Sequence, residues 1–107
     1  MGLTRELPRQ GEIWWAETDH ERRPVLVVSR SEAAGRLDRL IVAPVTSTMR
    51  GIPSELALGS AEGLSRDCVA SFDNIRPFEV SLLTSRVGRL DFAKNRICSA
   101  LEALANC

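Results

Sequence analysis

The apolar residues of this chain come in short runs that are too brief for ordinary helices and rich in β-branched side chains. The two most regular runs are Val25–Val28 and Leu40–Thr46. Their length and composition favour strands, and the unbroken apolar character of Val25–Val28 favours a strand buried on both faces. Pro24 stands at the first position of that strand, where a missing N–H costs no ladder bond, and Pro44 indicates a sheet edge or a bulge. The chain is therefore predicted to be built mainly on a sheet.

Four further segments have the composition of strands and are separated by polar, Gly-containing or Asx-containing turns. These strands are Ile13–Ala16, Glu55–Leu58, Cys68–Phe72 and Val87–Leu90. The predicted turns include Thr18–Arg22, Ser31–Gly35 and Asp73–Asn74. Because Trp14 and Trp15 are successive residues of one strand, they are expected to face opposite sides of the sheet.

The pattern changes to a helical one at the C-terminal end. Asp91 is a predicted N-cap, and apolar residues then recur at helical spacing. They are Phe92, Ile97, Ala100, Leu101 and Leu104, of which Ile97, Leu101 and Leu104 are expected in the core. Antiparallel strands followed by one amphipathic helix predict an α+β chain, mainly β, folded as a small barrel-like sheet. With no repeat or linker, residues 1–107 are expected to form a single domain.

Charge and cysteine content limit the environment and the partners. Fourteen basic and fourteen acidic side chains cancel, so a nucleic-acid site has to be local rather than a global positive field. The three cysteines are an odd number without a C-x-x-C pair, which argues against a disulfide framework or a zinc site. No signal-peptide h-region and no apolar stretch of the ~20 residues that a membrane span requires is present. We therefore expect a cytoplasmic protein without membrane contact, and at 107 residues a homodimer is a plausible source of further stability.

The chain lacks the motifs of most hydrolytic chemistries. It has one histidine, no phosphate-binding glycine loop and no carboxylate cluster with metal spacing, so neither a metal nor another cofactor is expected. RNA cleavage by the substrate's own 2′-hydroxyl needs only positioning, proton transfer and a cation for the phosphorane. Arg23, at the start of a strand, has the permanent charge and planar fork for that task. A strand-end hydroxyl such as Thr46 can be carried beside it.

The residues alone leave ordinary alternatives open for each of these candidates. Arg23 can be a solvated charge or a surface ion pair. Thr46 and Ser47 can be strand-end hydroxyls that bind turn backbone, and Asp73 can simply begin a turn. His20 can be a surface imidazole without a partner.

Five blocks, in order and at fitting separations, resemble the MazF/PemK family of toxin endoribonucleases, the mRNA interferases of bacterial toxin–antitoxin operons. The blocks are Gly11–Trp15, Arg23–Val28, Val42–Ser47, Asp67–Arg76 and Val87–Leu90. The resemblance covers nearly the whole chain and implies an SH3-like (CcdB/PemK-type) small barrel that forms a homodimer. It implies cleavage of single-stranded RNA at a short sequence, with 2′,3′-cyclic phosphate and 5′-hydroxyl products. It also implies neutralisation by a cognate antitoxin, MazE-like or similar.

The resemblance also assigns roles to residues. Arg23 takes the position of the family's catalytic arginine, and Thr46 takes that of its catalytic threonine or serine. The residues assigned to RNA binding are Ser47, Asp73, Asn74, His20 and Glu21, with Asp73 a proton-transfer group in some members.

This sequence departs from the family pattern at two places. The loop before the Arg23–Val28 block is shortened to Thr18–Arg22, and Ser71 stands where some members carry a basic residue suggested as the general acid. Two other functions are kept as alternatives. One is a non-enzymatic toxin like CcdB, which shares the barrel fold and binds gyrase, and the other is an inactive barrel that only binds an antitoxin.

Overall fold

The computed structural model describes residues 7–30 and 38–105, and within them the chain forms seven strands, three short 3-10 helices and one α-helix. The strands are β1 (Glu12–Glu17), β2 (Arg22–Val27), β3 (Arg39–Thr46), β4 (Glu55–Leu58), β5 (Cys68–Ser71), β6 (Arg76–Glu79) and β7 (Leu83–Arg89). The 3-10 helices are Ser60–Glu62, Phe72–Asn74 and Val80–Leu82, and the helix α1 is Ala93–Ala105. The turn predicted at 31–35 lies outside the described residues.

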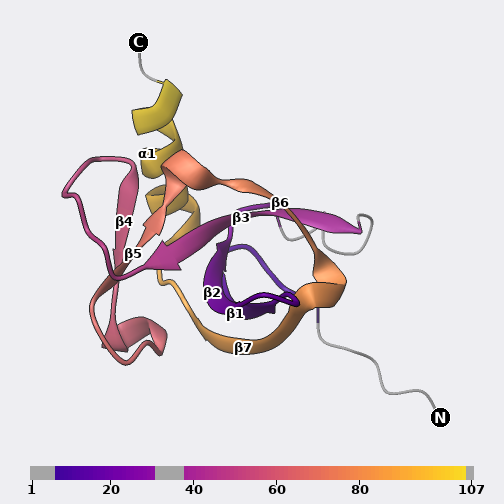
Figure 1. Ribbon diagram of the computed structural model, residues 1–107. Coiled ribbons are helices and arrows are strands. Elements are labelled where there is room, and N and C mark those ends of the chain that lie inside the picture. The colour runs from indigo at the N-terminus through magenta and orange to yellow at the C-terminus, as the bar shows by residue number, and fades with distance from the viewer. Residues whose placement is uncertain (1–6, 31–37, 106–107) are drawn as a thin grey trace.

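All strand pairs are antiparallel, in the order β4-β5-β3-β2-β1-β7, with β6 beside β3. Figure 1 shows β7, β1 and β2 curling into a rounded wall, with α1 standing at one end near β4 and β5. Register shifts at Ile13/Trp14 and Trp15/Ala16, where β1 meets β7, add local twist and support this curl. The predicted small antiparallel barrel with a C-terminal helix is confirmed.

The described part of α1 is too short and too polar to cross a membrane.

β3 is the central strand, and Pro44 stands at a local edge within it. One side of β3 pairs with β2, while the other pairs first with β6 over Arg39–Val42 and then with β5 at Val45 and Thr46. The N–H of Val28 donates to the carbonyl of Ile41 at 2.9 Å. The alternation of an antiparallel ladder then puts the nitrogen of Pro44 on the side away from β2, between β6 and β5. The missing donor therefore costs no bond to β2.

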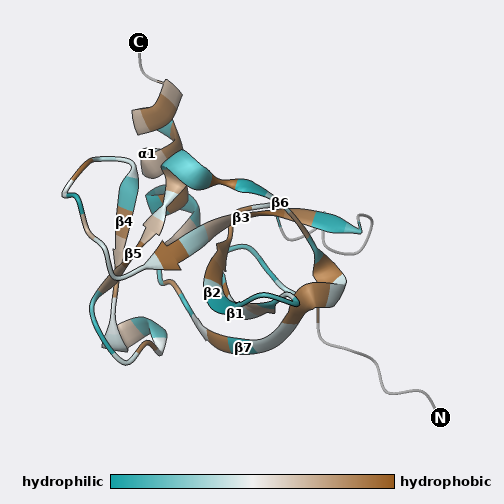
Figure 2. Cartoon of the chain, in the orientation of Figure 1, coloured by the Kyte–Doolittle hydropathy of each residue, from teal (hydrophilic) through white to brown (hydrophobic). Residues whose placement is uncertain are grey.

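The sheet separates two apolar clusters, because successive residues of a strand face opposite sides. The larger cluster includes Ile13, Leu26, Ala43, Val45, Phe72 and Ile97 of α1. The smaller includes Trp14, Val25, Val27, Leu40, Val42 and Leu83. The prediction that Val25–Val28 is buried on both faces is confirmed. Trp14 is buried and Trp15 is half-buried beneath the guanidinium of Arg22, 4.0 Å from its ring centre. Figure 2 shows that the turn that follows β5 is largely hydrophilic.

The start of α1 packs directly on the backbone that precedes β1. Gly11 has a φ of +88°, and a Cβ at this position would collide with the Cβ of Ala93. Its carbonyl also accepts the N–H of Leu90 at 2.8 Å. A residue without a side chain is needed here because both the conformation and the close approach exclude one.

Three strands differ from the predictions by more than one residue at an end. β2 begins at Arg22, so Pro24 lies inside the strand, opposite Trp15. The sequence pattern missed β6, because its Pro and its mostly exposed side chains give no apolar alternation. β7 begins at Leu83 rather than at Val87, since Leu83 is followed by the exposed polar residues Thr84–Arg86, and it ends at Arg89.

The ends of the helix also differ. The carbonyl of Phe92 accepts the N–H of Arg96 at 3.1 Å, so Phe92, and not Asp91, occupies the N-cap position. Phe92 has a φ of +54° and is 81% exposed, and Leu104 is 41% exposed. The prediction of Leu104 as a core residue was wrong, because helical spacing does not reveal how far the helix extends past the sheet. Phe92, the first residue of the predicted apolar repeat, precedes the helix at its N-cap position. Ile97 is buried, and Leu101 packs partly buried against the larger cluster.

A buried carboxylate ties β1 to β7. Glu12 is 6% exposed and accepts hydrogen bonds from the N–H of Arg9 at 2.8 Å, the indole of Trp14 at 3.0 Å and the guanidinium of Arg86 at 2.9 Å. Burial opposes ionisation, but these three donors outweigh it and lower the pKa of Glu12 below its ordinary value.

Replacing Glu12 with Gln keeps the side-chain shape but removes the charge that the three donors face. We expect the free energy of unfolding at neutral pH to fall by about 1–3 kcal/mol, the usual cost of disrupting hydrogen bonds to a buried group. Because the folded-state pKa is lowered, this contribution is complete above the unfolded-state value of 4.5 and is lost as the pH falls through the folded-state pKa. Thermal unfolding at neutral and at acidic pH measures the difference, which should narrow in acid. The exposed Glu79 supplies the control substitution Glu79→Gln, and an equal loss in both variants would refute the assignment.

Candidate active site

One face of β3 leads from the smaller apolar cluster into a polar cavity. Leu40 and Val42 are buried in the cluster, and Pro44 and Thr46 follow on the same face because side chains alternate along a strand. Both of these line a cavity of about 510 Å³. The strand that builds the core therefore also places a hydroxyl at the cavity wall.

β2 brings Arg23 to the same cavity. Val25 lies opposite Pro44 in the β2–β3 register, and extending this register by two residues places Arg23 opposite Thr46. Both residues line the cavity. β2 and β3 are thus neighbouring strands that carry a guanidinium and a hydroxyl at the same end, as the two sequence blocks indicated.

Three other parts of the chain complete the cavity: the loop and strand after β3, the end of β5 with the turn that follows it, and the start of β6. The residues they contribute are Thr48, Arg50, Glu55, Ser71, Asn74 and Arg76. Three of the nine lining residues are arginines, and one is a carboxylate. The cavity therefore suits an anionic ligand.

Thr46 has a structural bond as well as a place at the cavity. Its Oγ1 accepts the N–H of Thr48 at 3.1 Å, the strand-end turn that is the ordinary role of such a residue. A hydroxyl that accepts one hydrogen bond still has its own hydrogen to donate. The turn holds the oxygen in place, and the hydrogen remains available for a ligand oxygen.

Arg23 is held only weakly. Its Nη2 lies 3.4 Å from Oε2 of Glu21, and the side chains are 43% and 48% exposed. An exposed ion pair of this kind contributes about 0–1 kcal/mol, so an anionic ligand can displace the carboxylate.

Glu55 organises the loop between β3 and β4. Its side chain is 3% exposed and accepts the N–H groups of Arg50 at 2.8 Å and Gly51 at 2.9 Å, while Nε of Arg50 lies 3.3 Å from its second oxygen. Burial opposes ionisation of Glu55, but the two backbone donors and the Arg50 side chain outweigh it and lower the pKa of this carboxyl. Glu55 is therefore a fixed anion that holds the loop at the cavity.

The turn after β5 joins this loop. Oδ2 of Asp73 accepts hydrogen bonds from Nη2 of Arg50 at 3.2 Å and from the hydroxyl of Ser54 at 3.0 Å. The amide of Asn74 donates to the buried hydroxyl of Ser71 at 2.9 Å. Asp73 thus faces the loop, and Asn74 lines the cavity.

The residues nominated from the sequence are not all brought together. Arg23, Thr46 and Asn74 line the cavity, and Asp73 is linked to it through Arg50. Ser47, His20 and Glu21 are exposed and are not among its lining residues. His20 lies in the β1–β2 turn, where its N–H donates to Oγ1 of Thr18 at 3.3 Å.

Sequence reasoning missed Arg50, Glu55 and Arg76 as parts of the site. Glu55 begins a predicted strand, but the composition of that strand does not show that its first residue faces a cavity. Arg76 closes one of the recognised blocks, but its position depends on β6 pairing with β3, and β6 was not predicted.

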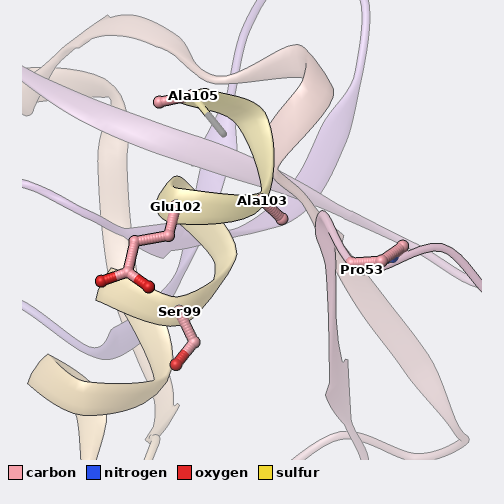
Figure 3. A pocket seen from close by; sticks show the side chains of 5 residues that line it. All are labelled: Pro53, Ser99, Glu102, Ala103 and Ala105. Atoms are coloured by element: carbon pink, nitrogen blue, oxygen red, sulfur yellow. The ribbon is translucent and has the colours of Figure 1, made fainter. Parts of the chain in front are cut away.

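A second cavity, of about 640 Å³, lies against α1 and has different chemistry. Its lining residues are Pro53, Ser99, Glu102, Ala103 and Ala105. Figure 3 shows Ala103 on the side of α1 toward Pro53, and Glu102 projecting from the helix. With one carboxylate and no cation in its wall, this cavity is a poor match for a phosphate. Within residues 7–30 and 38–105, no three His, Cys, Asp or Glu side chains are grouped as metal ligands would be.

Comparison with known families gives a match over most of the chain. The family described as PemK-like, MazF-like toxin of type II toxin–antitoxin system matches residues 9–105. Among curated proteins, the chain is 41% identical to the probable endoribonuclease MazF5 of Mycobacterium tuberculosis, over 94% of this chain and 95% of that protein. It is 39% identical to the probable endoribonuclease MazF2 of the same species, over 92% and 99% of the two chains.

Solved structures show the same similarity in three dimensions. The Mycobacterium tuberculosis toxin MazF-mt6 aligns with a TM-score of 0.79 and 30% identity, covering 88% of this chain and 96% of that one. An endoribonuclease in complex with its cognate antitoxin, from a mycobacterial species, aligns with a TM-score of 0.79 and 25% identity, covering 94% and 97%.

The role of Glu55 can be tested by Glu55→Gln, which keeps an acceptor but removes the charge. We expect the amide hydrogens of Arg50 and Gly51 to exchange about tenfold faster, because their acceptor is weakened and the loop opens locally. Hydrogen exchange followed by NMR measures this effect. Amides of the β2–β3 ladder, such as that of Val28, are the internal control. Unchanged exchange at Arg50 and Gly51 would show that Glu55 does not hold the loop.

Proposed function

This chain belongs to the PemK-like, MazF-like toxin family of type II toxin–antitoxin systems, and from that premise we propose that it is an endoribonuclease toxin whose cavity between β2 and β3 cuts single-stranded RNA. The observation that carries this proposal is the convergence of Arg23 and Thr46 on one cavity. A fold is shared by unrelated activities, so the site has to support the function independently. A guanidinium and a hydroxyl facing one anion-binding space provide that support.

The reaction uses a nucleophile that the RNA brings with it. The 2′-oxygen attacks the adjacent phosphorus and loses its proton, the bond from phosphorus to the 5′-oxygen breaks, and that oxygen gains a proton. The products are a 2′,3′-cyclic phosphate and a 5′-hydroxyl end. The protein therefore contributes positioning and charge stabilisation.

Arg23 and Thr46 act on the phosphate during this step. The guanidinium of Arg23 leaves Glu21 and bridges two phosphate oxygens, which gain negative charge as the phosphorane forms. The hydroxyl of Thr46 donates to a non-bridging oxygen while the N–H of Thr48 holds it in place. Asn74 lies at the same cavity with amide groups that can contact a base. Metal ions have no role in this scheme.

The same cavity provides a site for the neutralising partner. A cognate antitoxin with a disordered segment of acidic and apolar residues would place carboxylates against the cavity arginines and exclude RNA. One solved relative is an endoribonuclease in complex with its cognate antitoxin, which supports the expectation of such a partner. The active form is a homodimer in the cytoplasm.

Arg23→Ala and Thr46→Ala should each leave the fold intact and slow RNA cleavage. We expect a loss of about 100- to 1,000-fold in the cleavage rate for Arg23→Ala, the usual effect of removing a group that stabilises developing charge. Single-turnover cleavage of a mapped RNA site measures it. The matched control is Arg39→Ala, which removes an exposed arginine at the far end of β3.

Equal cleavage by wild type and Arg23→Ala would refute the catalytic assignment. A wild-type protein that cuts no RNA but binds a gyrase subunit would instead support the CcdB-like alternative.

Removal of divalent ions should leave cleavage unchanged, because Arg23 supplies the positive charge at the phosphate. Replacing the 2′-hydroxyl at the cut position with hydrogen should abolish cleavage, because the nucleophile is gone. Both effects are measured as cleavage rates of one mapped RNA. The first experiment compares the rate with and without a chelator, and the second compares the RNA with a version that carries one deoxynucleotide at the cut position. Loss of activity in the chelator, restored by added metal, or cleavage of the deoxy-substituted RNA, would contradict the mechanism.

A further inference from the structure

Three guanidinium groups line the cavity that holds Thr46, and they differ in how much of their charge is already paired. They belong to Arg23, Arg50 and Arg76. RNA presents several phosphates to a groove, so a cation that is not neutralised by the protein is the strongest attraction for one of them. The pairing of each arginine therefore indicates its task.

The guanidinium of Arg50 is already paired with carboxylates of the protein. Its Nε and Nη2 lie 3.3 Å from Glu55 and 3.2 Å from Asp73, so one guanidinium bridges two carboxylates. Glu55 is itself held by two backbone N–H groups. Arg50 thus joins the loop after β3 to the turn after β5, and these two carboxylates neutralise its charge.

Arg76 has no such partner. Its side chain is exposed, and no hydrogen bond or ion pair joins it to any residue in 7–30 or 38–105. It also differs from Arg23, whose charge is shared with Glu21. Among the three cavity arginines of the described chain, Arg76 is therefore the one whose charge is uncompensated.

The strand register directs Arg76 toward the site. It lies opposite Val42 in the β6–β3 pair, so its side chain is on the face of β3 that carries Pro44 and Thr46. Val42 and Thr46 are four residues apart, about 13 Å along the strand. Arg76 is thus on the cavity face but set back from the place where Arg23 and Thr46 meet.

We propose that Arg76 binds a phosphate of the RNA that flanks the scissile one, and so positions the strand across the cavity. This inference rests on the proposed endoribonuclease function. The contact is the same before and during the reaction, because the flanking phosphate gains no charge. Arg76 therefore contributes to binding rather than to the chemical step.

The test uses an RNA whose cut site has been mapped with the wild-type protein. For binding, the nucleotide at the cut carries a 2′-deoxy substitution, so that the complex survives measurement. The variants are Arg76→Ala and Arg76→Lys, with Arg39→Ala as the matched control. Arg39 is an exposed arginine on the same β3–β6 ladder, three residues or about 10 Å from Val42, and it does not line the cavity.

We expect Arg76→Ala to raise Kd about tenfold and to lower the slope of log affinity against log salt by about 0.7, the value for one phosphate of a single strand. KM should rise while kcat stays within about threefold of wild type, the pattern of lost uniform binding. Arg76→Lys should keep most of the salt slope, because it keeps the charge. Arg39→Ala should match wild type in Kd and slope.

Several outcomes would overturn the inference. An unchanged Kd and salt slope in Arg76→Ala would exclude a phosphate contact, and a loss confined to kcat would place Arg76 in the chemistry instead. An equal loss of affinity in Arg39→Ala would show that the effect comes from the overall charge of the protein and not from a specific phosphate contact. If Arg76→Ala shows a lowered melting temperature, Arg76→Gln replaces it under the same criteria. Wild-type protein that cuts no RNA would remove the proposed function, and the inference with it, whereas the other outcomes leave the function intact.

Discussion

The structure depends on β3, the strand that pairs with three other strands. β3 bonds to β2 along one side, and its other side passes from β6 to β5 at Pro44, the residue that has no N–H to offer. This change of partner opens a space between β6 and β5 where a continuous ladder would have closed it. The cavity residues surround that space, so core and site share one backbone and one side-chain alternation.

The charges around the cavity fall into two groups with different tasks. The carboxylates of Glu55 and Asp73 hold Arg50 and the loop in place, and both are engaged in several bonds. Within the described residues, Arg23 pairs with the exposed Glu21 alone, and a phosphate can displace this carboxylate. A chain of zero net charge can therefore still present a local positive surface, because the carboxylates of Glu55 and Asp73 are already paired with groups of the protein.

The sequence predicted the parts of the fold that have strong local signals. The doubly buried β2, the alternating β4 and the amphipathic α1 were all identified, and so were Arg23 and Thr46 as neighbours in space. β6 and the first half of β7 were missed because most of their side chains are exposed and give no apolar period. Glu55 and Arg76 were missed for a related reason: their place at the site comes from long-range register, which local pattern does not encode. The exposed Phe92 shows the opposite limit, since apolar character alone does not make a residue part of the core.

The strand order also determines at which stage of folding the wall beside this cavity is completed. β1 lies between β2, its neighbour in the sequence, and β7, which follows it by more than half the chain. The wall is therefore completed by a pairing between distant parts of the chain, and such pairing is slow relative to local contacts. Until β7 pairs with β1, the chain carries Arg23 and Thr46 on strands whose wall is incomplete. The fold thus makes a local pair of side chains depend on a contact that forms late.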